Sequence, residues 1–249
     1  MKFKAPLLFL FLAPVILTLT LSFNQEDQTY KVDQDRFYIH VADPTSGNLR
    51  MSLKNDTGAH FGSLKNLIRY EAQLGNEVKF AMNGGMYMEN QNPLGLYIEN
   101  GEQFRKLNRV KEAFGNFYLQ PNGVFYINKD NHAEISVTTN VKDVSDMKFA
   151  TQSGPMLLID GDYHPKLNKG SSNLRVRNGV GILPDGLVMF AISKKPVNFY
   201  DFATLFKQNG CQQALYLDGF VSRMYCPSSD VQQQGGRFGV IIYELMDSK

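Results

Sequence analysis

The stretch ALYLDGFVSRMYC, residues 214–226, places a short apolar run directly before an aspartate and a glycine. Its first four residues predict a buried strand. Asp218 followed by Gly219 is a common turn signal, so the aspartate could simply begin a hairpin turn. Ser222 and Arg223 come soon after, and a hydroxyl and a cation beside a carboxylate are also what a binding site needs. The stretch predicts a strand that ends at a turn or at a functional carboxylate, and the rest of the chain must decide.

The composition of the 249-residue chain is that of one globular domain. Hydrophobic residues make up 43% and charged residues 20%, which suits a large core with a polar surface. The formal net charge is +2, with acids and bases interspersed. A nucleic-acid-binding protein needs a basic stripe to neutralise phosphates. We therefore expect no nucleic-acid partner.

The N-terminal residues differ from the rest of the chain. Lys2 and Lys4 precede an uncharged, mostly apolar run that ends before Glu26. This order is typical of a secretory signal, and a run of about 20 residues could also span a membrane. We predict a signal peptide or an N-terminal membrane anchor over 1–23 and a polar tether over 24–35. Either alternative places the domain outside the cytoplasm, in the periplasm or secreted.

The cysteine and histidine patterns bear on disulfides and metals. Cys211 and Cys226 lie on either side of Asp218, and in an oxidising compartment they could form a disulfide. Two unpaired, buried thiols are the alternative. The four histidines are isolated, without zinc-binding spacing, and no complete dinucleotide-binding fingerprint occurs. We expect no metal and no cofactor.

Strand patterns dominate residues 36–249. Apolar or alternating runs occur at 36–42, 49–54 and 78–83, and Asn100-Gly101 predicts a tight turn. Two amphipathic segments interrupt these runs. Strands do not alternate strictly with helices, so the pattern predicts an α+β fold, a single domain with a large mixed or antiparallel β-sheet core and a few flanking helices.

Capping residues mark both predicted helices. Ser63 precedes a helical apolar face over residues 64–74, and Gly75 follows it. Asn198 precedes a second such face, and Gly210 ends it.

Four segments place glycines and polar residues just after apolar runs. They are FAMNGGMY (80–87), TQSGPMLLIDG (151–161), SSNLRVRNGVGI (171–182) and LDGFVSRMY (217–225). Each alone has an ordinary explanation, as a turn or as a solvated charge on an edge strand. Together they gather glycine amides, an arginine and a carboxylate at strand ends, where loops on a rigid sheet commonly carry function. Because arginine binds phosphate oxygens in pairs, this combination suits a sugar phosphate.

In this order, the four segments resemble the phosphodiester glycosidase family, and especially its short bacterial members. The likeness covers roughly residues 36–243. The segments that match the family's motifs are Asn83-Gly84-Gly85-Met86-Tyr87, Ser153-Gly154-Pro155-Met156-Leu157 with Gly161, Arg177-Asn178-Gly179-Val180-Gly181-Ile182, and Ala214 through Ser222. Two departures fall inside these motifs. Phe220 and Val221 replace glycines, and Asn178 replaces a serine or threonine, so we expect a different sugar preference.

The resemblance implies an extracytoplasmic hydrolase that cleaves a sugar-1-phosphodiester into a free sugar and a phosphomonoester. Its substrate would be a glycan or glycoconjugate that contains a sugar phosphate, such as an exopolysaccharide. Arg177 would hold the phosphate, and Asp218 would face the anomeric carbon as base or nucleophile. The substrate-binding residues expected beside them are Asn83, Gly84, Gly85, Ser153, Gly154, Asn178 and Ser222.

Glycosidases usually pair two carboxyl groups, but a phosphate leaves without strong protonation, so one carboxylate could suffice. Glu99, Asp160 and Asp201 are reserve candidates for an acid. A protein of this fold could instead bind a surface glycan or exopolysaccharide without cleaving it, because a fold does not fix a function. The two hypotheses differ at Asp218, where an amide could still bind hydroxyls but could not serve as base or nucleophile.

Overall fold

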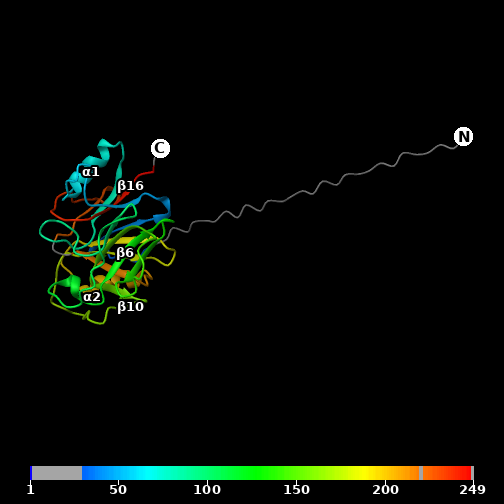
Figure 1. Cartoon of the computed structure of the whole chain (residues 1–249). Helices are drawn as coiled ribbons and strands as arrows, with labels where there is room; N and C mark the ends of the chain where they lie inside the picture. Colours follow the sequence, from blue (N-terminus) through cyan, green and yellow to red (C-terminus); the bar gives the residue numbers. More distant parts are fainter. Residues whose placement is uncertain (2–29, 219–220, 248–249) are drawn as a thin grey trace. The chain divides into compact units, whose positions relative to one another are not determined.

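The computed structural model of the chain describes Met1 and residues 30–218 and 221–247 (Figure 1). Lys31–Lys249 form one compact unit with its own hydrophobic cores. We expect this unit to fold by itself.

The predicted signal peptide or anchor, residues 1–23, lies outside the described residues except for Met1. The first half of the predicted tether, residues 24–29, lies outside them as well. Residues 31–35 belong to the compact unit, where Lys31 N donates to Asn209 Oδ1 at 2.8 Å. In the described part of the chain, no helix is long and apolar enough to cross a membrane.

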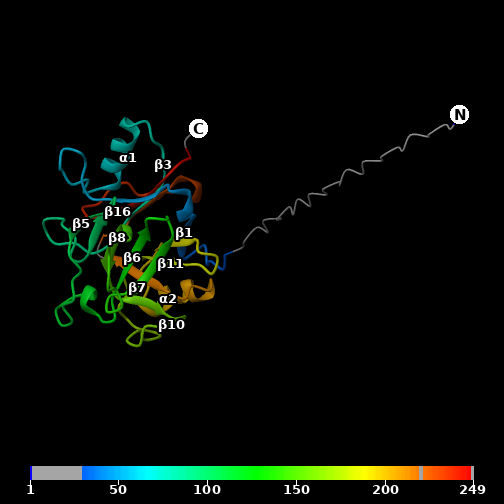
Figure 2. The same ribbon diagram turned by 45° about the vertical axis from the view of Figure 1, so that its right-hand side comes forward.

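Three sheets build the compact unit (Figures 1 and 2). The first contains β1 (Phe37–Ala42), β9 (Met156–Ile159), β10 (Asp162–Tyr163), β11 (Asn178–Ile182), β12 (Val188–Ser193) and β13 (Ala214–Asp218). The second contains β2 (Leu49–Ser52), β3 (Val78–Asn83), β14 (Met224–Cys226), β15 (Val231–Gln232) and β16 (Ile241–Leu245). The third contains β4 (Tyr97–Glu99), β5 (Glu102–Arg105), β6 (Gly123–Asn128), β7 (Ala133–Val137) and β8 (Met147–Ser153).

Strand order shows how the chain moves between sheets. The orders are β1-β12-β11-β13-β9-β10, β15-β14-β3-β16-β2 and β5-β4-β8-β6-β7, and all described strand pairs are antiparallel. The expected single domain is therefore present and strand-dominated, but its core consists of separate antiparallel sheets instead of one large sheet. Alternating hydrophobicity identifies the buried face of a strand without identifying its partner, so the sequence could not assign strands to sheets.

Three phenylalanines, one from each sheet, meet in the main core. The ring of Phe190 on β12 lies 4.9 Å from that of Phe80 on β3 and 5.9 Å from that of Phe125 on β6. All three side chains are fully buried. Aromatic side chains bury large apolar areas, so this contact is a principal reason why the three sheets stay together.

Both predicted helices form, and both caps are confirmed. Helix α1 spans Leu64–Gln73, and Asn66 N donates to the Ser63 hydroxyl at 3.3 Å. Helix α2 spans Phe199–Gln208, and Asp201 N donates to Asn198 Oδ1 at 2.8 Å. The helices lie at opposite ends of the compact unit (Figures 1 and 2). Three short 3-10 turns complete the description: η1 (Pro44–Ser46), η2 (Asn116–Tyr118) and η3 (Pro227–Ser229).

Helix α2 packs closely on the first sheet. A Cβ atom at Gly181 on β11 would lie 2.6 Å from the ring of Phe206. A side chain at this position would push the helix off the sheet, so the glycine permits the close approach. The GVG pattern at 179–181 therefore serves helix packing.

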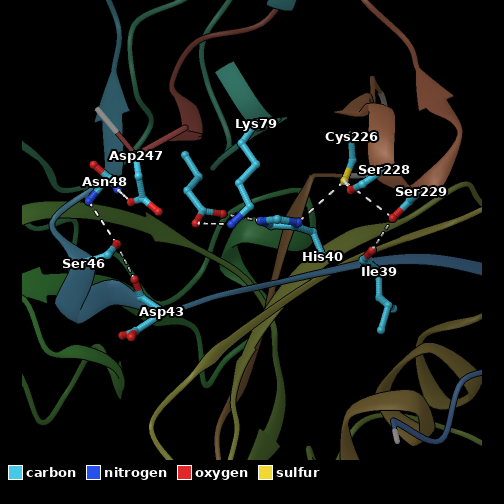
Figure 3. Close-up of polar contacts among 11 residues, drawn as sticks. Ile39, His40, Asp43, Ser46, Asn48, Lys79, Cys226, Ser228, Ser229 and Asp247 are labelled. Carbon is cyan, nitrogen blue, oxygen red and sulfur yellow. Dashed lines mark hydrogen bonds and ion pairs between the residues drawn. The ribbon is translucent and has the colours of Figure 1, made fainter. Parts of the chain in front are cut away.

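A buried polar network joins the first sheet to the second (Figure 3). The imidazole of His40 on β1 lies between the Cys226 thiol, 3.6 Å from Nδ1, and the Glu244 carboxylate, 2.5 Å from Nε2. Lys79 Nζ donates to the other oxygen of Glu244 at 2.9 Å. His40, Cys226 and Glu244 are buried, whereas the Lys79 side chain is 43% exposed.

These contacts move three pKa values. Burial alone would raise the pKa of the Cys226 thiol, but contacts with His40 and the hydroxyls of Ser228 and Ser229 outweigh it and lower that pKa to about 7. Burial opposes the charge on His40, but hydrogen bonds to Cys226 and Glu244 raise its pKa overall. Burial likewise opposes the charge on Glu244, but His40 and Lys79 hold the pKa of Glu244 below its usual range.

The disulfide alternative for the cysteines is wrong, because Cys211 and Cys226 are both free and buried. Cys226 ends β14 in the second sheet, whereas Cys211 follows α2 and packs against β11 of the first sheet. The two thiols thus belong to different layers of the core. Proximity in sequence did not place them together.

The buried network predicts a specific effect of Glu244→Gln on stability. The change leaves His40 without its counter-charge, so we expect the free energy of unfolding at pH 7 to fall by about 3 kcal/mol. Because the pKa of Glu244 is lowered on folding, the wild type gains stability above the ordinary carboxyl pKa and loses it as the pH falls through the folded-state value. Urea unfolding measured from pH 7 down to about pH 2, through the window between the ordinary and the lowered pKa of Glu244, should show a smaller loss of stability in the variant.

Lys79→Gln is the matched control. The Lys79 side chain is 43% exposed, so the loss of its charge should cost less than about 1 kcal/mol at pH 7. Equal losses in the two variants would contradict a stabilising pair between His40 and Glu244.

Candidate active site

Strand ends from all three sheets meet at one point. Asn83 ends β3, Ser153 ends β8, Asn178 begins β11 and Asp218 ends β13. All four residues are buried. The structure thus brings together one residue from each of the four glycine-containing segments, although these segments are far apart in the sequence.

Two side-chain amides hold Asp218 in place. Asn83 Nδ2 donates to Asp218 Oδ2 at 3.2 Å, and the Asp218 main-chain N–H donates to Asn178 Oδ1 at 2.8 Å. The Asn178 amide nitrogen donates to both oxygens of Asn83, at 2.8 Å to the main chain and 3.2 Å to the side chain. An amide offers both donors and an acceptor, so the pair can fix the backbone and the carboxylate of Asp218 at once.

The two predicted serines support the same strand. Ser153 Oγ donates to the carbonyl of Leu217 at 2.7 Å, and Ser222 Oγ donates to the carbonyl of Asp218 at 2.7 Å. Both hydroxyl protons are therefore used on main-chain carbonyls beside the carboxylate. Gly219 and Phe220 lie outside the described residues.

The predicted glycines are close-packed at this junction. Gly85 has a φ of 102°, and a Cβ there would lie 2.3 Å from Thr151 Oγ1. The amide of Gly84 donates to the carbonyl of Val240 at 2.8 Å, so it is committed to the protein. Gly154 is buried at the link between β8 and β9. The glycines thereby let three sheets approach the carboxylate.

Asp218 lines a cavity of about 680 Å³. Most of its wall is apolar, from the side chains of Met86, Tyr87, Met88, Leu94, Phe114, Phe117, Tyr216 and Val221. The polar and charged residues that line it beside Asp218 are Glu89, Asn116 and Arg237. A buried carboxylate at an apolar cavity is the arrangement expected of a reactive group.

Tyr87 and Arg237 form one side of this cavity. The Tyr87 hydroxyl donates to the carbonyl of Arg237 at 2.6 Å. Burial and the negative charge of Asp218 raise the pKa of Tyr87 to about 12, against the opposing effect of Arg237. Tyr87 therefore stays a neutral phenol at physiological pH and can donate a hydrogen bond.

Arg177 is fully buried and is not among the residues that line the cavity. Its Nε donates to the carbonyl of Val197 and its Nη2 to that of Asn173, both at 2.8 Å. The guanidinium lies 3.6 Å from the centre of the Phe199 ring and 5.4 Å from that of Tyr216, which does line the cavity. Burial lowers the pKa of Arg177, which remains strongly basic. Arg177 is thus no solvated edge charge and lies one side chain behind the cavity wall.

Arg237 and Glu89 line the cavity but were not predicted as site residues from the sequence. Arg237 lies in GGRFG, residues 235–239, which repeats the combination of glycines and a polar residue seen in the four segments. Glu89 follows the glycine-rich segment that ends at Tyr87. The position of Glu89 beside a glycine-containing segment and the glycines around Arg237 were the features of the sequence that could have identified these two residues.

The reserve acids lie elsewhere. Glu99 lines a second cavity of about 680 Å³, where it accepts hydrogen bonds from Tyr97 and Ser52. Asp160 accepts from Gln213, and Asp201 pairs with Arg36. None of the three lines the cavity of Asp218. Among the residues that the structure describes, no group of three or more His, Cys, Asp or Glu side chains could hold a metal ion.

The part of the chain that resembles known proteins contains the residues of this site. Residues 76–237 match the family model for phosphodiester glycosidases, a range that contains all four strand ends and Arg237. The uncharacterized protein YigE of Escherichia coli (strain K12) is 36% identical over 204 residues, which covers 82% of this chain and 79% of that protein.

Two solved structures share the fold. The catalytic domain of zebrafish N-acetylglucosamine-1-phosphodiester alpha-N-acetylglucosaminidase, auto-inhibited by its pro-peptide, superimposes with a TM-score of 0.58 at 13% identity, covering 84% of this chain and 82% of that one. A hypothetical protein from Synechocystis gives a TM-score of 0.52 at 14% identity, covering 85% of this chain and 59% of that one. At these identities the likeness shows the fold alone. Because the family model matches most of the chain and the bacterial relative is 36% identical over 82% of it, the chain belongs to the phosphodiester glycosidase family.

Proposed function

We propose, with membership of the phosphodiester glycosidase family as the premise, that the chain is an extracytoplasmic hydrolase of sugar-1-phosphodiesters. It would release a free sugar and a phosphomonoester from a glycan or glycoconjugate. The observation that carries the proposal is the buried carboxylate of Asp218, held by Asn83 and Asn178 at the wall of a cavity. The apolar start of the sequence supports the location outside the cytoplasm and allows N-terminal anchoring.

Asp218 acts at the anomeric carbon in this scheme. The bond between that carbon and the phosphate oxygen breaks, and the oxygen of water forms the new bond to carbon. Asp218 serves either as the base that takes a proton from water or as the nucleophile of a covalent intermediate. The hydrogen bond from Asn83 to Oδ2 orients the carboxylate for that attack. The phosphate leaves as a stable anion, which lowers the need for a strong acid.

Arg237 holds the phosphate in this scheme. It lines the cavity with Asp218, and its guanidinium can offset the charge that develops on the leaving group. The Tyr87 hydroxyl, whose proton goes to the Arg237 carbonyl, helps to hold Arg237 in place and can accept a hydrogen bond from a substrate hydroxyl. Glu89 is the second carboxyl group at the same cavity. Arg177 then acts as a positioning residue, because its guanidinium packs against the ring of Tyr216.

Asp218→Asn separates hydrolysis from binding. The amide keeps the size of the side chain but cannot serve as base or nucleophile, so we expect turnover to fall more than about 100-fold. Release of free sugar from UDP-N-acetylglucosamine and a panel of sugar-1-phosphodiesters measures this, with circular dichroism as the check on folding. Glycan retention by both proteins without turnover by either would instead favour the binding hypothesis.

Arg237→Gln and Arg177→Met form a second, paired test. Loss of a charge-assisted contact to phosphate should lower kcat/KM by about 10- to 100-fold in the Arg237 variant, with thermal stability unchanged. Arg177→Met should lose at least about 2 kcal/mol of unfolding free energy, because it removes charge-assisted hydrogen bonds to the carbonyls of Val197 and Asn173 and the stacking of the guanidinium on Phe199. If the Arg237 variant kept full activity and the Arg177 variant were stable but inactive, Arg177 and not Arg237 would be the residue that binds the phosphate.

A further inference from the structure

An exposed apolar and cationic segment borders the candidate active site. Residues 104–114, here named the mouth segment, comprise the last two residues of β5 and most of the connection from β5 to η2. Three large hydrophobic side chains in it are exposed: Phe104 at 57%, Val110 at 51% and Phe114 at 101%. Phe114 also lines the cavity of Asp218. An apolar ring wholly in water at the edge of an apolar cavity marks an interaction surface.

Hydrogen bonds from Asn108 and Arg109 hold the middle of the mouth segment in place. Arg109 donates to the carbonyls of Thr138 and Val141, at 3.3 and 2.7 Å. Asn108 N donates to Gln152 Oε1 at 2.9 Å, and its side chain donates to the carbonyl of Leu94 at 3.2 Å. Because its centre is bound to the third sheet, the segment presents Val110 to solvent from a fixed base.

The charge of the mouth segment is positive. It contains Arg105, Lys106, Arg109 and Lys111 against a single acid, Glu112. Arg105 and Phe104 line the neighbouring cavity of Glu99, and Arg105 Nη2 lies 3.9 Å from the sulfur of Met88, which lines the cavity of Asp218. Cations interleaved with exposed apolar side chains are typical of proteins that settle into the headgroup region of anionic membranes.

The cavity wall has matching chemistry. Met86, Met88, Leu94 and Phe117 offer few hydrogen bonds to a second sugar or a base. Methionine is flexible and polarizable and adapts its shape to an alkyl chain. Among the polar groups of the cavity, the Tyr87 hydroxyl interacts electrostatically with both Asp218 and Arg237, and we place the sugar phosphate beside these three residues.

We propose that this chain acts at the surface of an anionic membrane on a sugar-1-phosphate esterified to a lipid alcohol. The mouth segment enters the headgroup region, and the alkyl chain of the substrate lies along the methionine wall. This inference rests on the proposed function for the bond that is cleaved. Water adds to the anomeric carbon, the bond to the phosphate oxygen breaks, and the products are the free sugar and the lipid phosphate, with no further reactant.

Vesicle binding tests the surface without any assay of catalysis. Residues 31–249 serve here, because the apolar start of the sequence would itself bind lipid. We expect sedimentation with vesicles of phosphatidylglycerol and phosphatidylcholine, and at least tenfold weaker binding for Phe114→Ser. Lys106→Ser with Lys111→Ser should weaken binding to these anionic vesicles by a similar factor. Met246→Ser, which removes an exposed apolar side chain elsewhere (46%), is the matched control and should bind as the parent does.

Turnover then tests the substrate class. One sugar-1-phosphate is presented as its long-chain ester in anionic vesicles and as its methyl ester in solution. We expect at least tenfold higher kcat/KM on the long-chain ester, and a loss of this advantage, with unchanged methyl-ester turnover, in Lys106→Ser with Lys111→Ser. Equal turnover of both esters and no vesicle binding would overturn the inference and leave the proposed function standing. Turnover of neither ester would reject the proposed function, and the lipid substrate with it.

Discussion

The hydrogen bonds between Asn83, Asn178 and Asp218 are the interaction on which fold and site both depend. They connect the end of β3 in the second sheet with the facing ends of β11 and β13 in the first. All three residues are buried, so the loss of one partner leaves polar groups unpaired at about 1–3 kcal/mol each. The same bonds that join two sheets orient the carboxylate. Precision at the site is therefore a consequence of sheet assembly, because all three side chains come from the ends of paired strands.

The two arginines near the site show how one residue type serves two roles. The Arg177 guanidinium donates to the carbonyls of Val197 and Asn173 through Nε and Nη2 and lies over the rings of Phe199 and Tyr216, a position that suits a planar cation. That position stabilises the cavity wall from behind. Arg237 lines the cavity, where a guanidinium can pair with an incoming anion. Burial, which the chemistry of arginine alone does not reveal, distinguishes the structural cation from the one available to a ligand.

Local features of the fold could be predicted from the sequence, and long-range ones could not. The span of β3, both helix caps and the Asn100-Gly101 turn depend on a few neighbouring residues, and the structure has them as predicted; that turn has φ values of 51° and 82°. The division into sheets depends on pairings between distant strands. For the same reason the sequence identified the segments that meet at Asp218 but missed Arg237, which lines the same cavity and is joined by its main-chain carbonyl to Tyr87, 150 residues away in the sequence.

The departure at Val221 has a physical meaning in this cavity. Where the family resemblance leads us to expect a glycine, this chain has a branched side chain that lines the cavity and packs against the cluster containing Phe61 and Phe238. A glycine there would expose backbone and leave room for polar contacts, whereas valine adds apolar surface beside the carboxylate. Val221 therefore increases the apolar area of the cavity wall, as Met86 and Met88 do. Several parts of the chain thus make the wall apolar while the groups around Asp218 stay polar, which favours a substrate with a polar head and an apolar tail.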